Sequence, residues 1–152
     1  MSSSAPQVKA AVVALAGSVW PDAATYYGPP GIDMPRHVVS VGNARSTEIT
    51  RPTNGGTRAS RNEIFALDVI LSVYVPGDHT EQQAATEEAF TMMAALDDYL
   101  RIFGNQKLGG ICRDSWISGW ELAEAKAAND ENTAFIGRFA DLAVTLTVDT
   151  RI

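Results

Sequence analysis

The side chains that most often carry out chemistry in proteins are few in this sequence and are scattered along it. His37 and His79 could each bind a metal ion, but neither has a second ligand three or four residues away, the spacing that brings two ligands together on a helix. Cys112 is the single cysteine, so it has no partner for an internal disulfide. The adjacent Arg113 could lower its pKa, but a buried and inert cysteine is the commoner case. We therefore expect no metal site, no cofactor and no cysteine nucleophile.

Paired carboxylates are a second pattern that could support acid–base catalysis. Two such pairs occur, Glu87-Glu88 and Asp97-Asp98. Adjacent side chains on a helix point about 100° apart, so each pair is better explained as the solvated side of an amphipathic helix. The sequence also lacks the common motifs of nucleotide binding, serine hydrolysis and zinc proteolysis. These observations favour a protein that is not an enzyme.

The charge of the chain is acidic overall but uneven. Its 152 residues contain 12 Lys and Arg against 18 Asp and Glu, a net charge of −6. Such a chain is a poor candidate for binding nucleic acid through phosphate neutralisation, unless positive charge is concentrated locally. The segment 45–62 does concentrate it, because four arginines and one glutamate give this segment +3 and leave −9 for the rest of the chain. The four arginines are Arg45, Arg51, Arg58 and Arg61.

This basic segment is also the one long stretch without an apolar pattern, and we expect a flexible loop or arm over residues 45–62. One interpretation is a solvated connection whose charge aids solubility. The other is an arm that contacts an acidic partner or a phosphate backbone, since arginine suits both. A second copy of this acidic chain could itself be that partner.

Apolar periodicity predicts the elements that hold these residues. A helix is expected over 6–19, an irregular aromatic loop around Tyr26 and Tyr27, a strand over 37–44 and a long strand over 63–75. A second helix is expected over 80–103, with an apolar stripe that ends at Phe103, followed by an antiparallel hairpin of strands 115–128 and 133–152. The order predicts one α+β domain over residues 1–152, a mostly antiparallel sheet with two helices packed on one face.

Two tryptophans lie in the first strand of the expected hairpin. Trp116 and Trp120 share one face of that strand by parity, and such residues more often belong to the core. Tryptophan is also enriched at interface hot spots, so an assembly contact stays open for either residue. No apolar run reaches the eighteen or more residues of a membrane-spanning helix, so we expect no membrane partner.

Taken along nearly its whole length, the chain resembles the tail terminator proteins, also called tail completion proteins, of long-tailed bacteriophages. The resemblance lies in the expected architecture, the chain length and the general character of the segments, and it includes no diagnostic motif. It rests on these segments in order: VKAAVVALAGSV, HVVSVGNA with the polar arm after it, EIFALDVILSVYVPGD, TEQQAATEEAFTMMAALDDYLRIF and AVTLTVDTRI.

The resemblance implies a structural virion protein of the phage tail, assembled in the host cytoplasm. It would form a hexameric ring that caps the tail tube, ends tube polymerisation and offers the surface for head attachment. DNA would pass through the ring lumen without specific binding, and no catalytic residues or cofactors are carried over. The arm matches the place of a flexible arm in such proteins, which makes Arg45, Arg51, Arg58 and Arg61 candidates for contact with the tube protein or a neighbouring subunit.

Three alternatives stay open. Head–tail connector and neck stopper proteins of similar size share parts of the pattern. The basic arm could face the lumen and contact DNA. A small ligand-binding module or enzyme could use Tyr26, Tyr27 and the Gly/Pro-rich loop after them as a lid.

Overall fold

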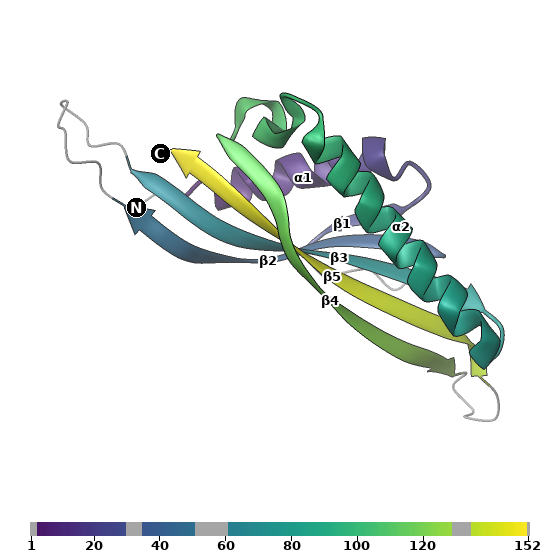
Figure 1. Ribbon diagram of the computed structural model, residues 1–152. Coiled ribbons are helices and arrows are strands. Elements are labelled where there is room, and N and C mark those ends of the chain that lie inside the picture. Colours follow the sequence, from purple (N-terminus) through teal and green to yellow (C-terminus); the bar gives the residue numbers. More distant parts are fainter. Residues whose placement is uncertain (1–2, 30–34, 51–60, 129–134, 152) are drawn as a thin grey trace.

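The computed structural model describes residues 3–29, 35–50, 61–128 and 135–151, and it has the expected α+β architecture. Five strands form one sheet, and two helices pack on the same face of it (Figure 1). The helices are α1 (Ala5–Val19) and α2 (Gln82–Arg101), with the 3-10 turns η1 (His79–Glu81) and η2 (Asn105–Gly110). The strands are β1 (Ala24–Tyr27), β2 (His37–Thr50), β3 (Asn62–Pro76), β4 (Asp114–Ala128) and β5 (Phe135–Arg151).

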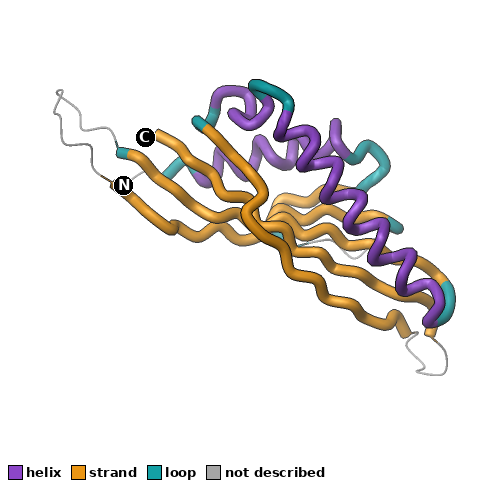
Figure 2. Tube along the Cα trace, viewed as in Figure 1, coloured by secondary structure: helices purple, strands orange, loops and turns teal. Residues whose placement is uncertain are grey.

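The strands lie in the order β1-β2-β3-β5-β4, and all pairs except β1–β2 are antiparallel. The two central strands pair along their whole length, from Asn62 opposite Arg151 to Pro76 opposite Gly137. β4 and β5 form the antiparallel hairpin that the sequence predicts. Figure 2 shows the sheet as a long, strongly twisted ribbon with α2 lying along one half of it. The sheet therefore has two edge strands, β4 on one side and β1 with the far part of β2 on the other.

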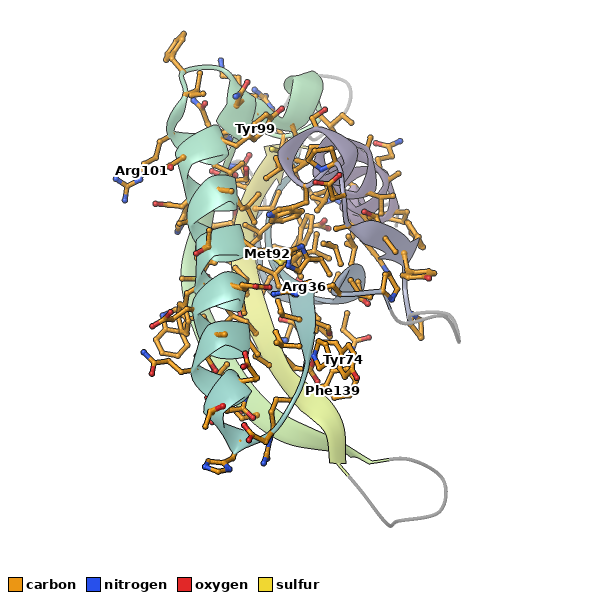
Figure 3. The ribbon with its side chains drawn as sticks, turned by 90° about the vertical axis from the view of Figure 1, so that its right-hand side faces the viewer. Arg36, Tyr74, Met92, Tyr99, Arg101 and Phe139 are labelled. Atoms are coloured by element: carbon orange, nitrogen blue, oxygen red, sulfur yellow. The ribbon has the colours of Figure 1, made fainter. Side chains whose placement is uncertain are left out.

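The core lies between one face of this sheet and the two helices. Alternate residues of β3 and β5 point to this side, as their period of two requires, and they are fully buried. Trp20 follows α1 and joins the two helices, because its Nε1 donates a hydrogen bond of 3.0 Å to the carbonyl oxygen of Met92 in α2. Figure 3 shows Met92 on the side of α2 that faces the sheet and α1. We call the opposite side of the sheet the open face.

Three expectations about element boundaries are wrong. Residues 24–27, expected to be irregular, form β1, which pairs with Val38–Val41 of β2. The β-favouring sequence Ala-Thr-Tyr-Tyr lies between Pro21 and Pro29, so no proline prevents its pairing at a sheet edge. The expected arm over 45–62 also begins too early, because residues 45–50 continue β2 and pair with β3. Residues 51–60 lie outside the described residues.

The third wrong boundary is the end of α2. The helix ends at Arg101, because Ile102 has an extended backbone conformation and Gly104 follows with φ of 99°. The apolar stripe therefore ends at Leu100, and its buried methionine is Met92. Phe103, expected at the end of the stripe, is 92% exposed, and its neighbour Ile102 is 60% exposed.

Candidate functional site

The arginines of the basic segment are not gathered into one described cluster. Arg45 lies in β2, where its Nη1 is 3.2 Å from Oδ2 of Asp68 and its side chain is 60% exposed. Arg61 lies just before β3 and is half-buried. Arg51 and Arg58 lie outside the described residues. An ion pair as exposed as Arg45–Asp68 contributes little to stability, so Arg45 remains available for a further acidic contact.

Among the described residues, nothing pairs with the outer edge of β2 over its second half. β1 pairs with β2 only as far as Val41, whose carbonyl oxygen also accepts a hydrogen bond from the amide of Gly28. Beyond it, no described strand lies outside β2, and residues 43–50 are exposed. We call residues 44–50 the β2 edge. An edge strand presents unpaired backbone donors and acceptors, which makes it a template for a further strand.

β4 forms the other edge and carries both tryptophans of the sequence prediction. Trp116 is 43% exposed and Trp120 is 55% exposed, so neither belongs to the buried core. They do not share a face, because the pairing shifts between Ile117 and Gly119 and this bulge reverses the parity of the strand. Trp116 lies on the open face, level with Thr147, whereas Trp120 lies on the helix face, level with Val144.

The two tryptophans consequently have different surroundings. The ring of Trp120 packs edge-on against Phe90 of α2, with ring centroids 4.9 Å apart and an angle of 88° between the planes. For Trp116 no comparable ring contact occurs among the described residues. A glycine within a strand often marks a bulge, so Gly119 was the signal in the sequence that parity counting overlooked.

Two acidic residues meet where β4 begins. Asp114 and Asp149 are directly opposite each other in the β4–β5 ladder, on the open face. Within the described parts of the chain, no cation lies within ion-pair distance of either carboxylate. Like charges directly opposite each other destabilise a sheet by roughly 0.2–1 kcal/mol. Arg113 and Arg151 flank the two carboxylates, but neither carboxylate has an ion-pair partner among the described residues, so a cation from outside would stabilise this position.

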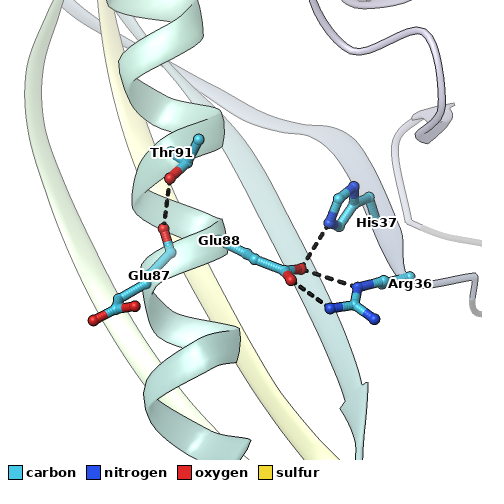
Figure 4. A network of polar contacts seen from close by, with 5 residues as sticks. All are labelled: Arg36, His37, Glu87, Glu88 and Thr91. Atoms are coloured by element: carbon cyan, nitrogen blue, oxygen red, sulfur yellow. Dashed lines mark hydrogen bonds and ion pairs between the residues drawn. The ribbon is translucent and has the colours of Figure 1, made fainter.

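Glu88 was expected on the solvated side of α2, but it has three polar contacts (Figure 4). Its carboxylate accepts hydrogen bonds from both Nε and Nη2 of Arg36, the former at 3.1 Å, and His37 Nε2 lies 2.9 Å from Oε2. The bond from Arg36 lowers the pKa of Glu88, an effect that partial burial opposes and His37 reinforces. The contacts hold α2 against the start of β2. Glu88 therefore has a structural role and forms no acid–base pair with Glu87. Its neighbour Glu87 is exposed, as expected.

Replacing Glu88 with glutamine should lower the free energy of unfolding at pH 7 by less than about 1 kcal/mol, because Arg36 is largely exposed. The pKa of Glu88 is lower in the folded chain, so its contribution is complete above the ordinary pKa of a glutamate and disappears as the pH falls through the folded value. Urea unfolding should show a smaller difference between the variant and the wild type at pH 3 than at pH 7. Glu87→Gln is the matched control, and an equal loss at both pH values would contradict the expectation.

Cys112 is buried, and its Sγ lies 3.3 Å from the carbonyl oxygen of Gln106. Burial raises its pKa to about 11, and the carboxylates of Asp114 and Asp149 act in the same direction. The neighbouring Arg113 does not lower it, since its guanidinium bonds Asn62 instead. These surroundings support an inert thiol.

The thiol of Cys112 should react with a disulfide reagent at pH 8 about 100-fold more slowly in the native protein than in urea, because the thiolate fraction falls by roughly that factor. Absorbance of the released thiolate measures the rate. A Ser118→Cys variant, with an exposed thiol on the same strand, should react rapidly without urea. Comparable native and unfolded rates for Cys112 would show that the site opens readily.

One hollow lies beside the tyrosines that were candidates for a lid. A pocket of about 360 Å³ lies between α1, the end of β1 and the open face, and Lys9, Ser40, Asn43 and Asp68 contribute its polar groups. Tyr27 belongs to β1, and Nζ of Lys9 is 4.3 Å from its ring centroid. Of the described residues in the pocket wall, Lys9 and Asp68 are charged, and Asp68 already binds Arg45.

Other chemistry is not assembled in the described parts of the chain. They contain no group of three or more His, Cys, Asp or Glu side chains that could hold a metal ion. His79, the second metal-ligand candidate, is exposed in η1. Asp97 binds Arg101 one helical turn away, at 3.0 Å, while Asp98 is exposed. Neither α1 nor α2 is long and apolar enough to cross a membrane.

No protein-family model matches the chain, and no curated protein matches it.

Proposed function

We propose that this chain is a structural protein of a long-tailed phage that forms a ring, caps the tail tube, ends tube polymerisation and provides the surface for head attachment. The observation that carries the proposal is the combination of two sheet edges, uncovered among the described residues, with large apolar side chains exposed on a strand and on a hydrogen-bonded turn. Large exposed apolar side chains next to unpaired strands are typical of surfaces that bind other proteins.

Among the described residues, four of the seven exposed large apolar side chains lie in two places, and the other three are Tyr27, Ile49 and Ile111. One place is β4, with Trp116 and Trp120, and the other place is the turn after α2, with Ile102 and Phe103. The turn is well defined, because the amide of Ile102 donates to the carbonyl of Tyr99 and that of Asn105 donates to Ile102. A ring subunit needs one surface for its neighbours and another for the tube, and these two places provide one for each.

The decisive experiment adds the purified protein to polymerising tail-tube subunits and follows tube length by electron microscopy. We expect protein bound at one end of each tube and no further growth. Unchanged tube length without end-binding would reject the function. Binding to the head vertex without any effect on tubes would favour a head–tail connector or neck stopper instead.

Replacing Arg51, Arg58 and Arg61 together with serine should impair capping, because the basic arm is our candidate contact for the tube or a neighbouring subunit. Thermal stability should change by less than about 0.5 kcal/mol, the usual range for surface substitutions. Tube length and the melting temperature are the two measurements. A double variant with Lys9→Ser and Arg36→Ser is the control for lost positive charge, because both residues lie away from the arm, β4 and the turn after α2. Large destabilisation of the arm variant would show that the arm is structural.

The pocket beside β1 supports a second candidate, a small ligand-binding module. Its size falls in the range of about 300–1,000 Å³ typical of small-molecule sites. Only one charged group in its wall, Lys9, is without an ion pair among the described residues, so the pocket suits a small anionic ligand. A rise in melting temperature with inorganic phosphate that Lys9→Ala abolishes, together with no effect on tubes, would favour this candidate over the ring.

A further inference from the structure

We infer that copies of this chain associate edge to edge, with the start of β4 in one copy pairing antiparallel with the β2 edge of the next copy. This inference rests on the ring-forming part of the proposed function and names the surfaces through which the ring would form. Every copy carries both edges on opposite sides of one sheet, so each can bind one neighbour on either side. Such head-to-tail contacts produce closed rings when the rotation between copies closes.

The direction of the strands suits this pairing. β2, β3, β5 and β4 alternate in direction across the sheet. A neighbouring β2 placed outside β4 therefore continues the antiparallel alternation when both sheets face the same way. Each edge is also bounded by a bulge at the same level, between Val41 and Ala44 in β2 and between Ile117 and Gly119 in β4. The uncovered parts of the two edges thus lie at the same end of the sheet, and the β2 edge contains one further bulge, between Ser46 and Glu48.

The pairing within one copy predicts which side chains would meet. Two neighbouring rows of paired residues run across the four strands on the open face. One row is Arg45, Ala66, Thr147 and Trp116, and the next is Glu48, Ile64, Asp149 and Asp114. A neighbour that continues the sheet without stagger brings its Arg45 opposite Trp116. Arginine over a tryptophan ring is a favourable cation–π contact. In the same register Glu48 would lie opposite Asp114, which is unfavourable.

A stagger of two residues removes this repulsion and keeps every side chain on its face. Arg45 of the neighbour then lies opposite Asp114, and Glu48 moves past the start of β4. Arg45 therefore reaches both residues in either register. Without stagger Trp116 lies directly opposite it and Asp114 lies diagonally, and with stagger the two exchange places. A diagonal neighbour is about 7–8 Å away, which a long side chain can reach. We favour the staggered register because it adds an ion pair.

Charge identifies the occupant as a second copy. The start of β4 carries the like-charged pair Asp114 and Asp149, without an ion-paired cation among the described residues. The β2 edge carries Arg45, which has five N–H donors and uses only one of them on Asp68. A neighbouring Arg45 would therefore supply the missing cation while it keeps its own contact. No other partner needs to be invoked, since both complementary edges are present in every copy.

A charge swap tests the contact by sedimentation velocity over a range of protein concentrations. Arg45→Glu and Asp114→Arg should each raise the dissociation constant between subunits about tenfold or more, and the double variant should recover most of the wild-type association. Arg101→Glu is the matched control, because Arg101 points away from the molecule on α2 and should leave association unchanged (Figure 3). Wild-type assemblies that both single variants form equally well would overturn the edge contact and leave the ring proposal standing. A wild-type protein that stays monomeric at all concentrations would reject both.

Disulfide trapping tests the geometry independently. One preparation carries Arg45→Cys and the other carries Asp114→Cys or Trp116→Cys, while Cys112 stays buried in all of them. Cross-strand pairs have Cα distances that a disulfide can bridge. Oxidation should give a cross-linked dimer in the mixtures and not in any preparation alone. A higher yield with Asp114→Cys would indicate the staggered register, and a higher yield with Trp116→Cys would indicate the register without stagger. Dimers of Arg45→Cys with itself would overturn the inference in favour of a symmetric β2–β2 contact. Efficient trapping with no effect on tubes would support the edge contact and reject the tail function.

Discussion

Replacing Leu67 with alanine is expected to lower the free energy of unfolding by about 2–5 kcal/mol. Leu67 is fully buried in the middle of β3, opposite Leu146 of β5, where the two central strands face the helices. The shortened side chain would leave a cavity lined by neighbours that belong to a paired ladder and cannot easily move inward. Urea unfolding should show a lower midpoint, and the melting temperature should fall by about 4–20 °C at equal protein concentration.

Ile49→Ala is the control for Leu67→Ala, because Ile49 lies in the neighbouring β2 and is 39% exposed. Its replacement should cost less than about 1 kcal/mol. Similar losses for the two variants would contradict the placement of the core between the sheet and the helices. If Leu67→Ala does not fold, Leu67→Val removes fewer atoms and should show the same ranking with a smaller loss.

Replacing Trp20 with alanine should cost about 3–5 kcal/mol, the second large effect that we expect. Trp20 is 6% exposed and joins the end of α1 to α2 through packing and through its hydrogen bond to Met92. Without it α1 loses the contact that holds its C-terminal end against the second helix. Chemical unfolding followed by circular dichroism measures the loss, and hydrogen exchange should show α1 opening before the sheet.

Two further variants separate the contributions of Trp20. Trp20→Phe keeps an aromatic ring but removes the indole donor and part of the buried volume, so its cost should exceed the roughly 1 kcal/mol of a lost hydrogen bond and stay below that of Trp20→Ala. Trp116→Ala removes an equally large side chain from an exposed position and should change monomer stability by less than about 0.5 kcal/mol. An equal loss for Trp116→Ala and Trp20→Ala would mean that Trp116 is buried in the folded monomer, which would also contradict its use at an interface.

The contrast between the tryptophans matters for the functional proposal. Tertiary structure buries Trp20 and leaves Trp116 and Trp120 at an edge, although all three are large apolar residues. A residue like Trp116, held by a strand and exposed on one side, costs little conformational entropy when a partner covers it. This makes the edge of β4 a better candidate for assembly than the basic arm alone.

The sequence by itself determined the parts of the structure that depend on local periodicity. The alternation of β3 and β5 and the helical stripe through Ala89 and Leu96 predicted the sheet, the helices and the α+β class, because burial of one face requires these periods. The sequence alone did not predict the polar contacts between distant segments. The bonds from Arg36 and His37 to Glu88 join residues about fifty positions apart, and no local pattern records them.

Only the tertiary structure decided which surfaces remain uncovered. The short strand β1 covers the first half of β2 and leaves the second half as an edge. Pairing with β3 extends β2 through Arg45, so this residue lies on that uncovered edge instead of in a loop. A single bulge turns Trp116 and Trp120 to opposite faces. Both outcomes depend on the register between strands, which is set by pairing across the sheet and by the packing of the whole core. Periodicity within one segment identifies the strand, whereas its neighbours determine what the strand presents to a partner.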